Sequence, residues 1–416
     1  MSFHRFAVVL LVIPAPVCAE NWPAWRGPRG DNHASSEPPL TWNDKENVRW
    51  KVALPGPGNS SPILWEDRIF VTQSFDKKGH KRGILCFKRQ NGAKLWERSV
   101  DYKDDEPTHS TNPFCAGTAA TDGKRVIACY GSAGVHCYDL DGKELWSYDV
   151  GKLYHIWGNS TSVILYKNTA ILWCSPGERQ FLLALDLDKG TKVWQTDVPG
   201  GKFGTDAKDW LGSWCTPTIA KVGDHDEMIL GVPDQVRGYN PETGDMLWSC
   251  DGAGRLMYTS PVVTKGNIVV AFSGFHGPAL AVRAGGKGDV TKTHRLWVQA
   301  KGNPQRIASP LLVDNRVLLI GENAVVNRFD PETGKELWDK ARLGASKVWS
   351  SPVLAGERVY VGTDDGDVFV FKADAMKFEQ LARNELGKGE IIRGTPAIAD
   401  GAIYIRTYKH LWRIGK

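Results

Sequence analysis

The segment Thr333-Gly334-Lys335-Glu336-Leu337-Trp338 decides the fold, because closely similar segments recur along the chain. In each clear copy a glycine in a polar turn lies four residues before a tryptophan. The other clear copies are Asn91-Gly92-Ala93-Lys94-Leu95-Trp96, Asp141-Gly142-Lys143-Glu144-Leu145-Trp146, Lys189-Gly190-Thr191-Lys192-Val193-Trp194 and Thr243-Gly244-Asp245-Met246-Leu247-Trp248. A weaker copy ends at Trp297 without the glycine, another ends at Phe378, and Trp50 begins the series.

The spacing of these eight marks indicates a repeated architecture. Successive marks are 40 to 54 residues apart, a period typical of β-propellers with one four-stranded blade per repeat. We therefore predict an all-β fold, an eight-bladed β-propeller of four-stranded antiparallel blades, with the tryptophan on the fourth strand. Seven tryptophans are predicted to pack between blades, where one large ring per repeat fills the space between neighbours. They are Trp50, Trp96, Trp146, Trp194, Trp248, Trp297 and Trp338.

The two ends of the repeat are each incomplete. Residues 48–53 resemble a fourth strand with no three strands before it, and three strands follow Phe378 without a fourth. We predict that they combine into one blade, with the N-terminal strand at its outer edge beside the strand around Trp412. This pairing closes the ring and removes a weak seam.

The first 19 residues have the pattern of a secretory signal peptide. An apolar run at 6–13 is too short to span a bilayer, and Val17-Cys18-Ala19 offers small residues before a cleavage site predicted ahead of Glu20. We expect a periplasmic or secreted protein. Lipidation of Cys18 is the less favoured alternative, because Val17 fits poorly the small residue that such a site requires.

Composition places the chain among soluble globular proteins. Of 416 residues, 42% are hydrophobic and 24% are charged, and the net charge is only +5. A nucleic-acid partner is not expected from so small an excess, nor is a membrane-spanning helix. Residues 20–46 are predicted to form an irregular leader against the ring, and residues 47–416 a single propeller domain. We expect a monomer.

The cysteines do not indicate a disulfide framework or a zinc site. After removal of the signal peptide seven remain, an odd number with no Cys-x-x-Cys pair. Cys129 and Cys137 flank a glycine-rich turn and could face each other across a hairpin, so the sequence does not decide whether they form a disulfide bond.

The glycine-to-tryptophan segment resembles the tryptophan docking motif of the PQQ-like (pyrroloquinoline quinone) β-propeller repeat family. Quinoprotein alcohol dehydrogenases and BamB-like outer-membrane assembly proteins share this repeat. The resemblance covers residues 47–416 and implies the propeller fold. It leaves function open, because the fold serves both enzymes and scaffolds.

The enzymatic members of that family use a vicinal cysteine pair, calcium and a catalytic aspartate, and this chain has no Cys-Cys dipeptide. Asp139, Asp141 and the Asp364–Asp367 run occupy positions where hairpin turns are needed, so we assign no metal site and no catalytic residue. We predict a non-catalytic binding or scaffold protein of the cell envelope with no cofactor. The alternatives are a PQQ-dependent quinoprotein dehydrogenase, and a carbohydrate-binding or carbohydrate-active propeller.

A ligand site is predicted where loops enter the innermost strands, at one end of the central channel. Cations on successive blades should form one arc of the rim, and His and Trp residues the other. Such a rim would suit an anionic, partly flat ligand, besides an envelope protein or polymer as partner. The candidates are Arg255, Arg306, Lys347, Arg393, His109, His155, Trp157, Trp214 and Trp349, with Trp210 nearby. The long loops at 101–116 and 200–213 are expected to be lids or partner surfaces.

Overall fold

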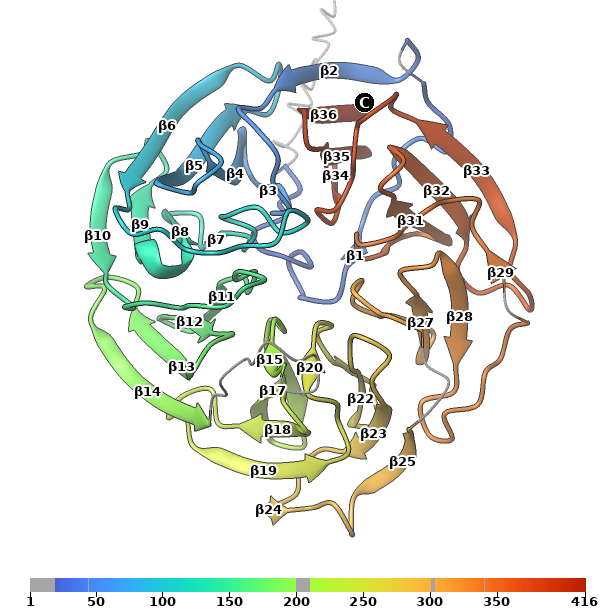
Figure 1. Ribbon diagram of the computed structural model, residues 1–416. Helices are drawn as coiled ribbons and strands as arrows, with labels where there is room; N and C mark the ends of the chain where they lie inside the picture. Colours follow the sequence, from blue (N-terminus) through green and yellow to red (C-terminus); the bar gives the residue numbers. More distant parts are fainter. Residues whose placement is uncertain (1–18, 44, 200–209, 301–303, 340) are drawn as a thin grey trace, which may run out of the picture.

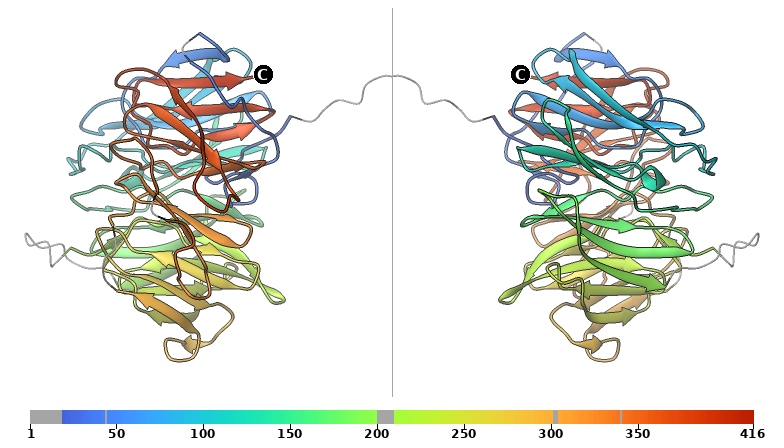
Figure 2. Two further views of the ribbon diagram at one scale, coloured as in Figure 1. Left: turned by 90° about the vertical axis from the view of Figure 1, so that its right-hand side faces the viewer. Right: turned by 90° about the vertical axis from the view of Figure 1, so that its left-hand side faces the viewer.

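The computed structural model describes residues 19–43, 45–199, 210–300, 304–339 and 341–416. The signal-peptide prediction, and most of the loop at 200–213, lie outside these residues. Figure 1 shows eight blades around a central channel, and Figure 2 shows the flattened side view. The described residues contain one short 3₁₀ turn, η1 (Gly131–Ala133), and no α-helix. No helix among them is long and apolar enough to cross a membrane.

The first four blades follow the chain, each running from the channel outward. Blade one is β3 (Ile63–Trp65), β4 (Arg68–Ser74), β5 (Lys81–Lys88) and β6 (Lys94–Asp101). Blade two is β7 (Ala120–Thr121), β8 (Arg125–Cys129), β9 (Val135–Asp139) and β10 (Glu144–Tyr148). Blade three is β11 (Ile164–Tyr166), β12 (Thr169–Cys174), β13 (Arg179–Asp186) and β14 (Lys192–Pro199). Blade four is β16 (Thr218–Val222), β17 (His225–Val232), β18 (Gln235–Tyr239) and β19 (Met246–Asp251).

The last four blades repeat the same order. Blade five is β21 (Val262–Val263), β22 (Ile268–Phe272), β23 (Ala279–Arg283) and β25 (Arg295–Gln299). Blade six is β26 (Leu311–Val313), β27 (Arg316–Ile320), β28 (Val325–Phe329) and β29 (Ala341–Arg342). Blade seven is β30 (Val353–Ala355), β31 (Arg358–Gly362), β32 (Asp367–Lys372) and β33 (Gln380–Glu385). Blade eight is β34 (Ala397–Ala399), β35 (Ala402–Arg406), β36 (His410–Gly415) and β2 (Val48–Ala53).

Blade eight confirms the predicted closure of the ring. β2 pairs antiparallel with β36, placing Lys51 opposite Trp412, so the N-terminal strand is the outer edge of the last blade. Short strands supplement the blades: β1 (His33–Ala34) adds to β30, β24 (Gly288–Asp289) adds to β19, and β15 (Gly212–Ser213) pairs with β20 (Leu256–Met257).

The glycine-to-tryptophan spacing has a geometric explanation. The tryptophan of one blade lies against the turn glycine of the next blade, as Trp50 does on Gly92 and Trp297 on Gly334. A Cβ at either glycine would lie within 2.9 Å of the ring, and both glycines have positive φ. The indole N–H of Trp50 also donates to the carbonyl of Arg89 at 3.1 Å.

Trp248 departs from this pattern, and the sequence of the next blade explains why. Blade five carries the copy without the glycine, so no open turn receives the ring. Instead the Trp248 indole lies against Gly238 of its own blade and donates to the Glu227 carboxylate at 2.7 Å. Trp338 and Phe378 also differ slightly from expectation, because each precedes the regular part of its outer strand.

The middle strands carry the core because neighbouring blades cover both of their faces. In β22, for example, all five residues of Ile268–Phe272 are buried, as continuous apolar strands between layers should be. The seven cysteines among the described residues are free. Cys129 pairs with Val135 and Cys137 with Ile127, so these two cysteines do not oppose each other across the hairpin.

Candidate functional site

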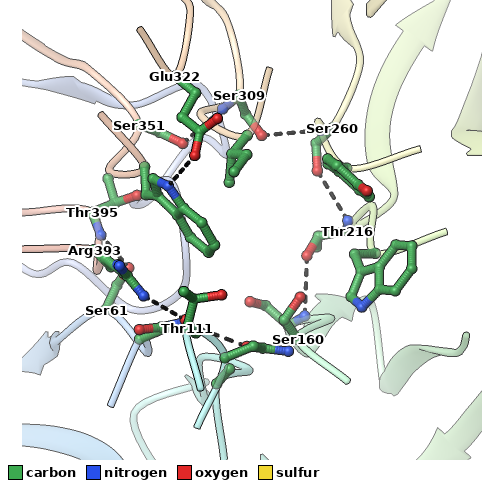
Figure 3. A pocket seen from close by; sticks show the side chains of 18 of the residues that line it. Ser61, Thr111, Ser160, Thr216, Ser260, Ser309, Glu322, Ser351, Arg393 and Thr395 are labelled. Atoms are coloured by element: carbon green, nitrogen blue, oxygen red, sulfur yellow. Dashed lines mark hydrogen bonds between the residues drawn. The ribbon is translucent and has the colours of Figure 1, made fainter. Parts of the chain in front are cut away.

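A cavity of about 420 Å³ lies at the end of the channel where the innermost strands begin. Its floor is a ring of one Ser or Thr per blade, each at least nine-tenths buried. The ring comprises Ser61, Thr118, Ser162, Thr216, Ser260, Ser309, Ser351 and Thr395. We call this cavity the cup. Figure 3 labels Ser61, Thr216, Ser260, Ser309, Ser351 and Thr395 of this ring, with dashed lines for hydrogen bonds.

The floor hydroxyls join the blades to one another. Around most of the ring, the backbone N–H of one member donates to the hydroxyl oxygen of the member in the next blade, at 2.9–3.1 Å. Thr395 receives a different donor, the indole N–H of Trp25, at 3.3 Å. The hydroxyl hydrogens of the ring make no hydrogen bond to any other described residue, so they remain available as donors to a ligand.

The leader closes the channel below this floor. Residues 22–34 bond to innermost strands on opposite sides of the ring, so they cross the channel. Thr121 of blade two donates its N–H to the carbonyl of Pro23, and Arg26 donates to the carbonyl of Pro310 in blade six. We call residues 20–34 the wedge. The cup is therefore blind, with the Trp25 ring among its lining residues.

One wall of the cup is aromatic. Trp157 and Trp214 lie 5.7 Å apart, and Tyr258 contacts Trp214 edge-on at 5.2 Å. Phe275 continues this wall to the rim, with 44% of its surface exposed. Such edge-on and tilted contacts are the favoured geometry of aromatic clusters, so the wall is held by its own packing.

Phe275 sits in a strained turn between β22 and β23. Phe275 and His276 both have positive φ, 44° and 62°, which costs a non-glycine residue about 1–2 kcal/mol. The turn is held by Gly274, which donates to the carbonyl of Leu256, and by Arg306, which donates to the carbonyl of Gly277 at 3.2 Å. Strain retained at a ligand-sized cavity points to function.

The opposite wall carries the charged groups. Trp349 donates its indole N–H to Glu322 at 3.2 Å, and Lys347 lies 3.3 Å from the same carboxylate. The guanidinium of Arg393 stacks over the Trp349 ring at 4.3 Å. It also binds Asp364 through two nitrogens, at 2.6 and 3.1 Å. Figure 3 shows Glu322 and Arg393 on this side.

The charges of this wall are thus compensated within the protein. The Arg393–Asp364 pair is almost fully buried, at 8% and 12% side-chain exposure. The guanidinium also donates to the carbonyl of Thr111 and to the Tyr408 hydroxyl, both at 2.7 Å. Burial opposes the charge of Arg393, but its hydrogen bonds to Asp364 and the nearby Tyr408 outweigh it and raise the pKa. Arg393 therefore acts as a latch between blades, not as a free cation.

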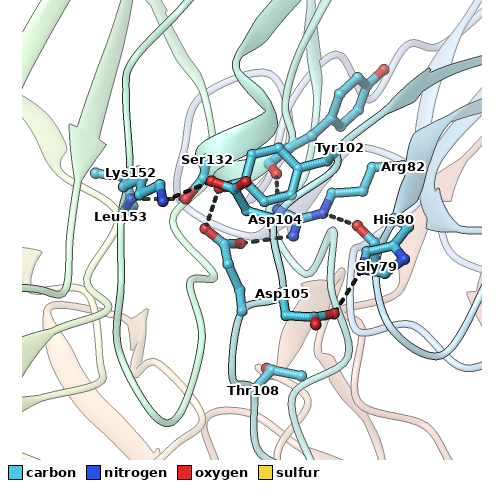
Figure 4. A network of polar contacts seen from close by, with 12 residues as sticks. Gly79, His80, Arg82, Tyr102, Asp104, Asp105, Thr108, Ser132, Lys152 and Leu153 are labelled. Carbon is cyan, nitrogen blue, oxygen red and sulfur yellow. Dashed lines mark hydrogen bonds and ion pairs between the residues drawn. The ribbon is translucent and has the colours of Figure 1, made fainter.

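The loop at 101–116 completes the rim, and a polar network fixes it (Figure 4). Arg82 pairs with Glu106 at 2.7 Å, with both side chains buried. The same guanidinium lies between the rings of Tyr102 and Phe114, at 4.5 and 4.4 Å. Further along the loop, Asn112 donates to the carbonyl of Trp157 at 2.7 Å. The loop is a built wall of the cup.

The structure brings together six of the nine candidates that the sequence nominated. These line the cup: Lys347, Arg393, His109, Trp157, Trp214 and Trp349. His155 is buried behind the aromatic wall, edge-on to Trp214 at 4.9 Å, and burial lowers its pKa to about 4. Arg306 is buried beneath the Phe275 turn, and Arg255 is exposed outside the lining. A role of these nine residues in ligand binding stays a prediction.

The expected basic arc is therefore not a free positive surface. Two of its four cations leave the lining, and the two that remain face internal carboxylates. Trp210 lies 4.7 Å from Trp157, behind the lining. Sequence reasoning missed Glu322, Phe275, Tyr258 and Trp25. In the sequence, six of the eight floor residues directly precede a proline, as in Ser61-Pro62 and Ser260-Pro261. These repeated Ser-Pro and Thr-Pro pairs are the one local signal of the hydroxyl floor.

The turn aspartates have structural partners. Asp139 accepts the backbone N–H groups of Asp141 and Lys143 at 3.0 and 2.8 Å, as a hairpin-turn aspartate does. Asp364 holds Arg393. Among the described residues, no three His, Cys, Asp or Glu side chains cluster in a way that could hold a metal ion.

Comparison with known proteins gives one family and a set of shared folds. A family model described as outer membrane protein assembly factor BamB matches residues 40–153, 80–301 and 182–414. No curated protein sequence matches the chain significantly.

Among solved structures, a europium-containing methanol dehydrogenase is similar with a TM-score of 0.68 and 11% identity, over 95% of this chain and 98% of that one. BamB from Moraxella catarrhalis gives 0.61 and 14%, over 88% and 96%. The quinohemoprotein alcohol dehydrogenase of Comamonas testosteroni gives 0.65 and 11%, over 95% and 80%. At these identities the likeness establishes the fold.

Proposed function

The chain belongs to the family described as outer membrane protein assembly factor BamB, and from that premise we propose that it is an exported, non-catalytic binding protein of the cell envelope. The blind cup carries the proposal. Its walls are fixed by internal contacts and its floor by the hydroxyl ring, so the recess is formed before any ligand arrives. A preformed cavity of a few hundred cubic ångströms with aromatic walls and a few polar groups is the usual form of a binding site.

The titratable groups around the cup support binding over catalysis. Glu322 already accepts from Trp349 and faces Lys347. His109 is exposed, and its ring nitrogen is 2.7 Å from the Thr111 hydroxyl. His155, buried behind the wall with a lowered pKa, stays neutral at physiological pH. A general base needs a lone pair aimed at its substrate. His155 lies behind the aromatic wall, and Glu322 and His109 each contact a neighbouring group of the cup.

A quinoprotein dehydrogenase is the second candidate, because the cup has aromatic walls that could face a flat ring. Its cofactor, PQQ, carries carboxylates, and the cations at the cup are directed to Asp364 and Glu322 instead. No vicinal cysteine pair is present, although the enzymes of this fold use one. The residues therefore do not fit the quinone, and we derive no reaction through it.

Export and partner binding are tested together. A photoreactive amino acid at Lys347, an exposed residue of the cup rim, should crosslink a partner in intact cells. The matched position is Lys265, exposed in the turn between β21 and β22 at the far end of blade five. We expect recovery of the protein in the periplasmic or secreted fraction, with crosslinks from Lys347 only.

Two results would overturn this function. One is equal crosslinking from Lys347 and Lys265, which would show that the cup end has no special role. The other is saturable binding of PQQ with calcium together with dye-linked oxidation of an alcohol or sugar, which would make the protein an enzyme.

A further inference from the structure

We propose that the cup is a carbohydrate-binding site that holds a neutral sugar ring of an envelope polysaccharide or oligosaccharide. This inference rests on the proposed binding function and names the chemistry of its ligand. It stands on three observations: two aromatic walls, polar groups that both donate and accept, and charges that cancel inside the protein.

The two walls suit the two faces of a sugar ring. Trp157 and Trp214 form one side of the cup, and Trp349 lines the other. Aromatic rings carry partial negative charge on their faces. A pyranose presents C–H bonds with slight positive charge on its flat sides, and such contacts add to the apolar area removed from water.

The polar groups of the cup match hydroxyls more closely than they match an anion. The floor supplies buried O–H donors from every blade, such as Ser260, which is 1% exposed. Acceptors lie beside them: the Glu322 carboxylate, and the Asn59 side-chain oxygen, which is buried and accepts no hydrogen bond from a described residue. A sugar hydroxyl donates and accepts at once, so it can satisfy both kinds.

An anionic ligand would be served less well. A carboxylate can only accept hydrogen bonds, so it could donate neither to the Asn59 oxygen nor to the Glu322 carboxylate. It would also approach the Glu322 carboxylate, while the buried Arg393 guanidinium is bound to Asp364. These contacts disfavour an anionic ligand, so neutral polyols are the favoured ligand class.

The Phe275 turn determines which ligands bind well at the rim. Its strained backbone holds an aromatic side chain half-exposed above the cavity, where a second sugar unit would lie. Buried Arg306 is a positioning residue for this turn through its bond to the Gly277 carbonyl. We therefore expect an oligosaccharide to bind more tightly than its monosaccharide.

The test is a titration of the full mature chain with neutral gluco-, galacto-, manno- and xylo-oligosaccharides. Oligogalacturonate and PQQ are the charged probes. Calorimetry and tryptophan fluorescence report binding, because three tryptophans line the aromatic faces. We expect saturable binding of at least one neutral oligosaccharide, weakened about tenfold by Phe275→Ala and by Glu322→Gln, a factor equal to about 1.4 kcal/mol.

Tyr154→Ala is the matched control. Tyr154 is 49% exposed, close to the 44% of Phe275, and does not line the cup. Its substitution should leave affinity unchanged. Circular dichroism and the unfolding midpoint check that each variant folds.

Several results would overturn the sugar assignment. They are no binding of any neutral oligosaccharide, binding that ignores the Phe275 and Glu322 substitutions, or tighter binding of the charged probes. If the Lys347 crosslinker still captures a partner in cells while every sugar fails, the binding function stands and only the ligand class is wrong. If both experiments fail, the proposed function is wrong as well.

Discussion

The two ends of the central channel are built from the same repeated strands, yet they differ in almost every physical respect. At the end closed by the wedge, Trp22 is 1% exposed and exchanges two backbone hydrogen bonds with Leu64 at 2.8–2.9 Å. At the cup end, Phe275 is 44% exposed in a strained turn. The wedge end is therefore sealed by buried contacts, whereas the cup end exposes an aromatic side chain at its rim.

Arg89 shows how firmly the closed end is held. Its guanidinium is almost fully buried and donates to the Tyr404 hydroxyl and the Glu20 carbonyl, both at 2.8 Å. It also pairs with Asp400 at 2.9 Å, and the Glu20 backbone N–H donates to that same carboxylate. The beginning of the wedge is therefore tied to blades one and eight at the seam of the ring.

The largest effect should come from the closed end. Trp22→Ala removes a buried ring from the core and leaves a cavity, which should lower the free energy of unfolding by about 3–5 kcal/mol. Urea denaturation followed by circular dichroism measures the loss. A loss below about 1 kcal/mol would show that the wedge does not stabilise the ring.

The next effect concerns the latch on the cup wall. Asp364→Asn leaves the Arg393 guanidinium buried without its carboxylate, so we expect destabilisation of about 3 kcal/mol. It should also raise affinity for oligogalacturonate, because a cation is released at the cup. Glu97→Gln, which breaks the exposed pair with Lys94, is the control and should cost under about 1 kcal/mol. Equal losses of unfolding free energy in the two variants would contradict a stabilising role for the Arg393–Asp364 pair.

Mild acid should weaken the cup end before the closed end. Burial lowers the pKa of His155 to about 4 from its usual 6.5, so the unfolded chain binds a proton first as pH falls. Stability is therefore full above about pH 6.5 and is lost toward pH 4, by about 2 kcal/mol between pH 7 and pH 5. His155→Phe should remove this loss while keeping a ring against Trp214. An unchanged pH profile in the variant would refute the assignment.

The Glu20 carboxyl at the closed end should respond later. Burial raises its pKa, but hydrogen bonds from Ser36 and the Asp400 backbone outweigh that effect and hold the pKa below its usual 4.5. The stability it contributes is present above pH 4.5 and is lost only as pH falls further. His155 therefore loses its contribution at higher pH than Glu20 does.

The smallest effect should come from the rim. Phe275→Gly relieves the positive φ at this position and loses the contacts of a half-exposed side chain, so the unfolding free energy should change by no more than about 1 kcal/mol. Ligand affinity should nevertheless fall about tenfold, as with Phe275→Ala. A large loss of stability would mean that Phe275 is a core residue.

The sequence predicted the fold because the docking tryptophan leaves a periodic mark. Each ring needs an open turn in the next blade, so glycine and tryptophan recur together, and counting them yields the blade number. Where the mark fails, as before Trp297, the structure also changes, since Trp248 turns back to Glu227. Ring closure followed from the same count.

The sequence predicted the position of the cup but not the arrangement of its charged groups. Its position follows from where the innermost strands begin. Its electrostatics do not, because the partner of Arg393 lies 29 residues away, in another blade. Likewise the floor depends on Trp25 reaching Thr395 across 370 residues. Contacts between residues so far apart in the sequence leave no local pattern in it.

The most direct test of the account is hydroxyl-radical footprinting of the mature chain, read by mass spectrometry at each tryptophan. We expect Trp157 and Trp349 to oxidise in the free protein, to be protected by a saturating neutral oligosaccharide, and Trp22 to stay unreactive throughout. Oxidation of Trp22 as fast as Trp157 would contradict the closed end. Unprotected Trp157 and Trp349 at saturation would contradict the cup as the binding site.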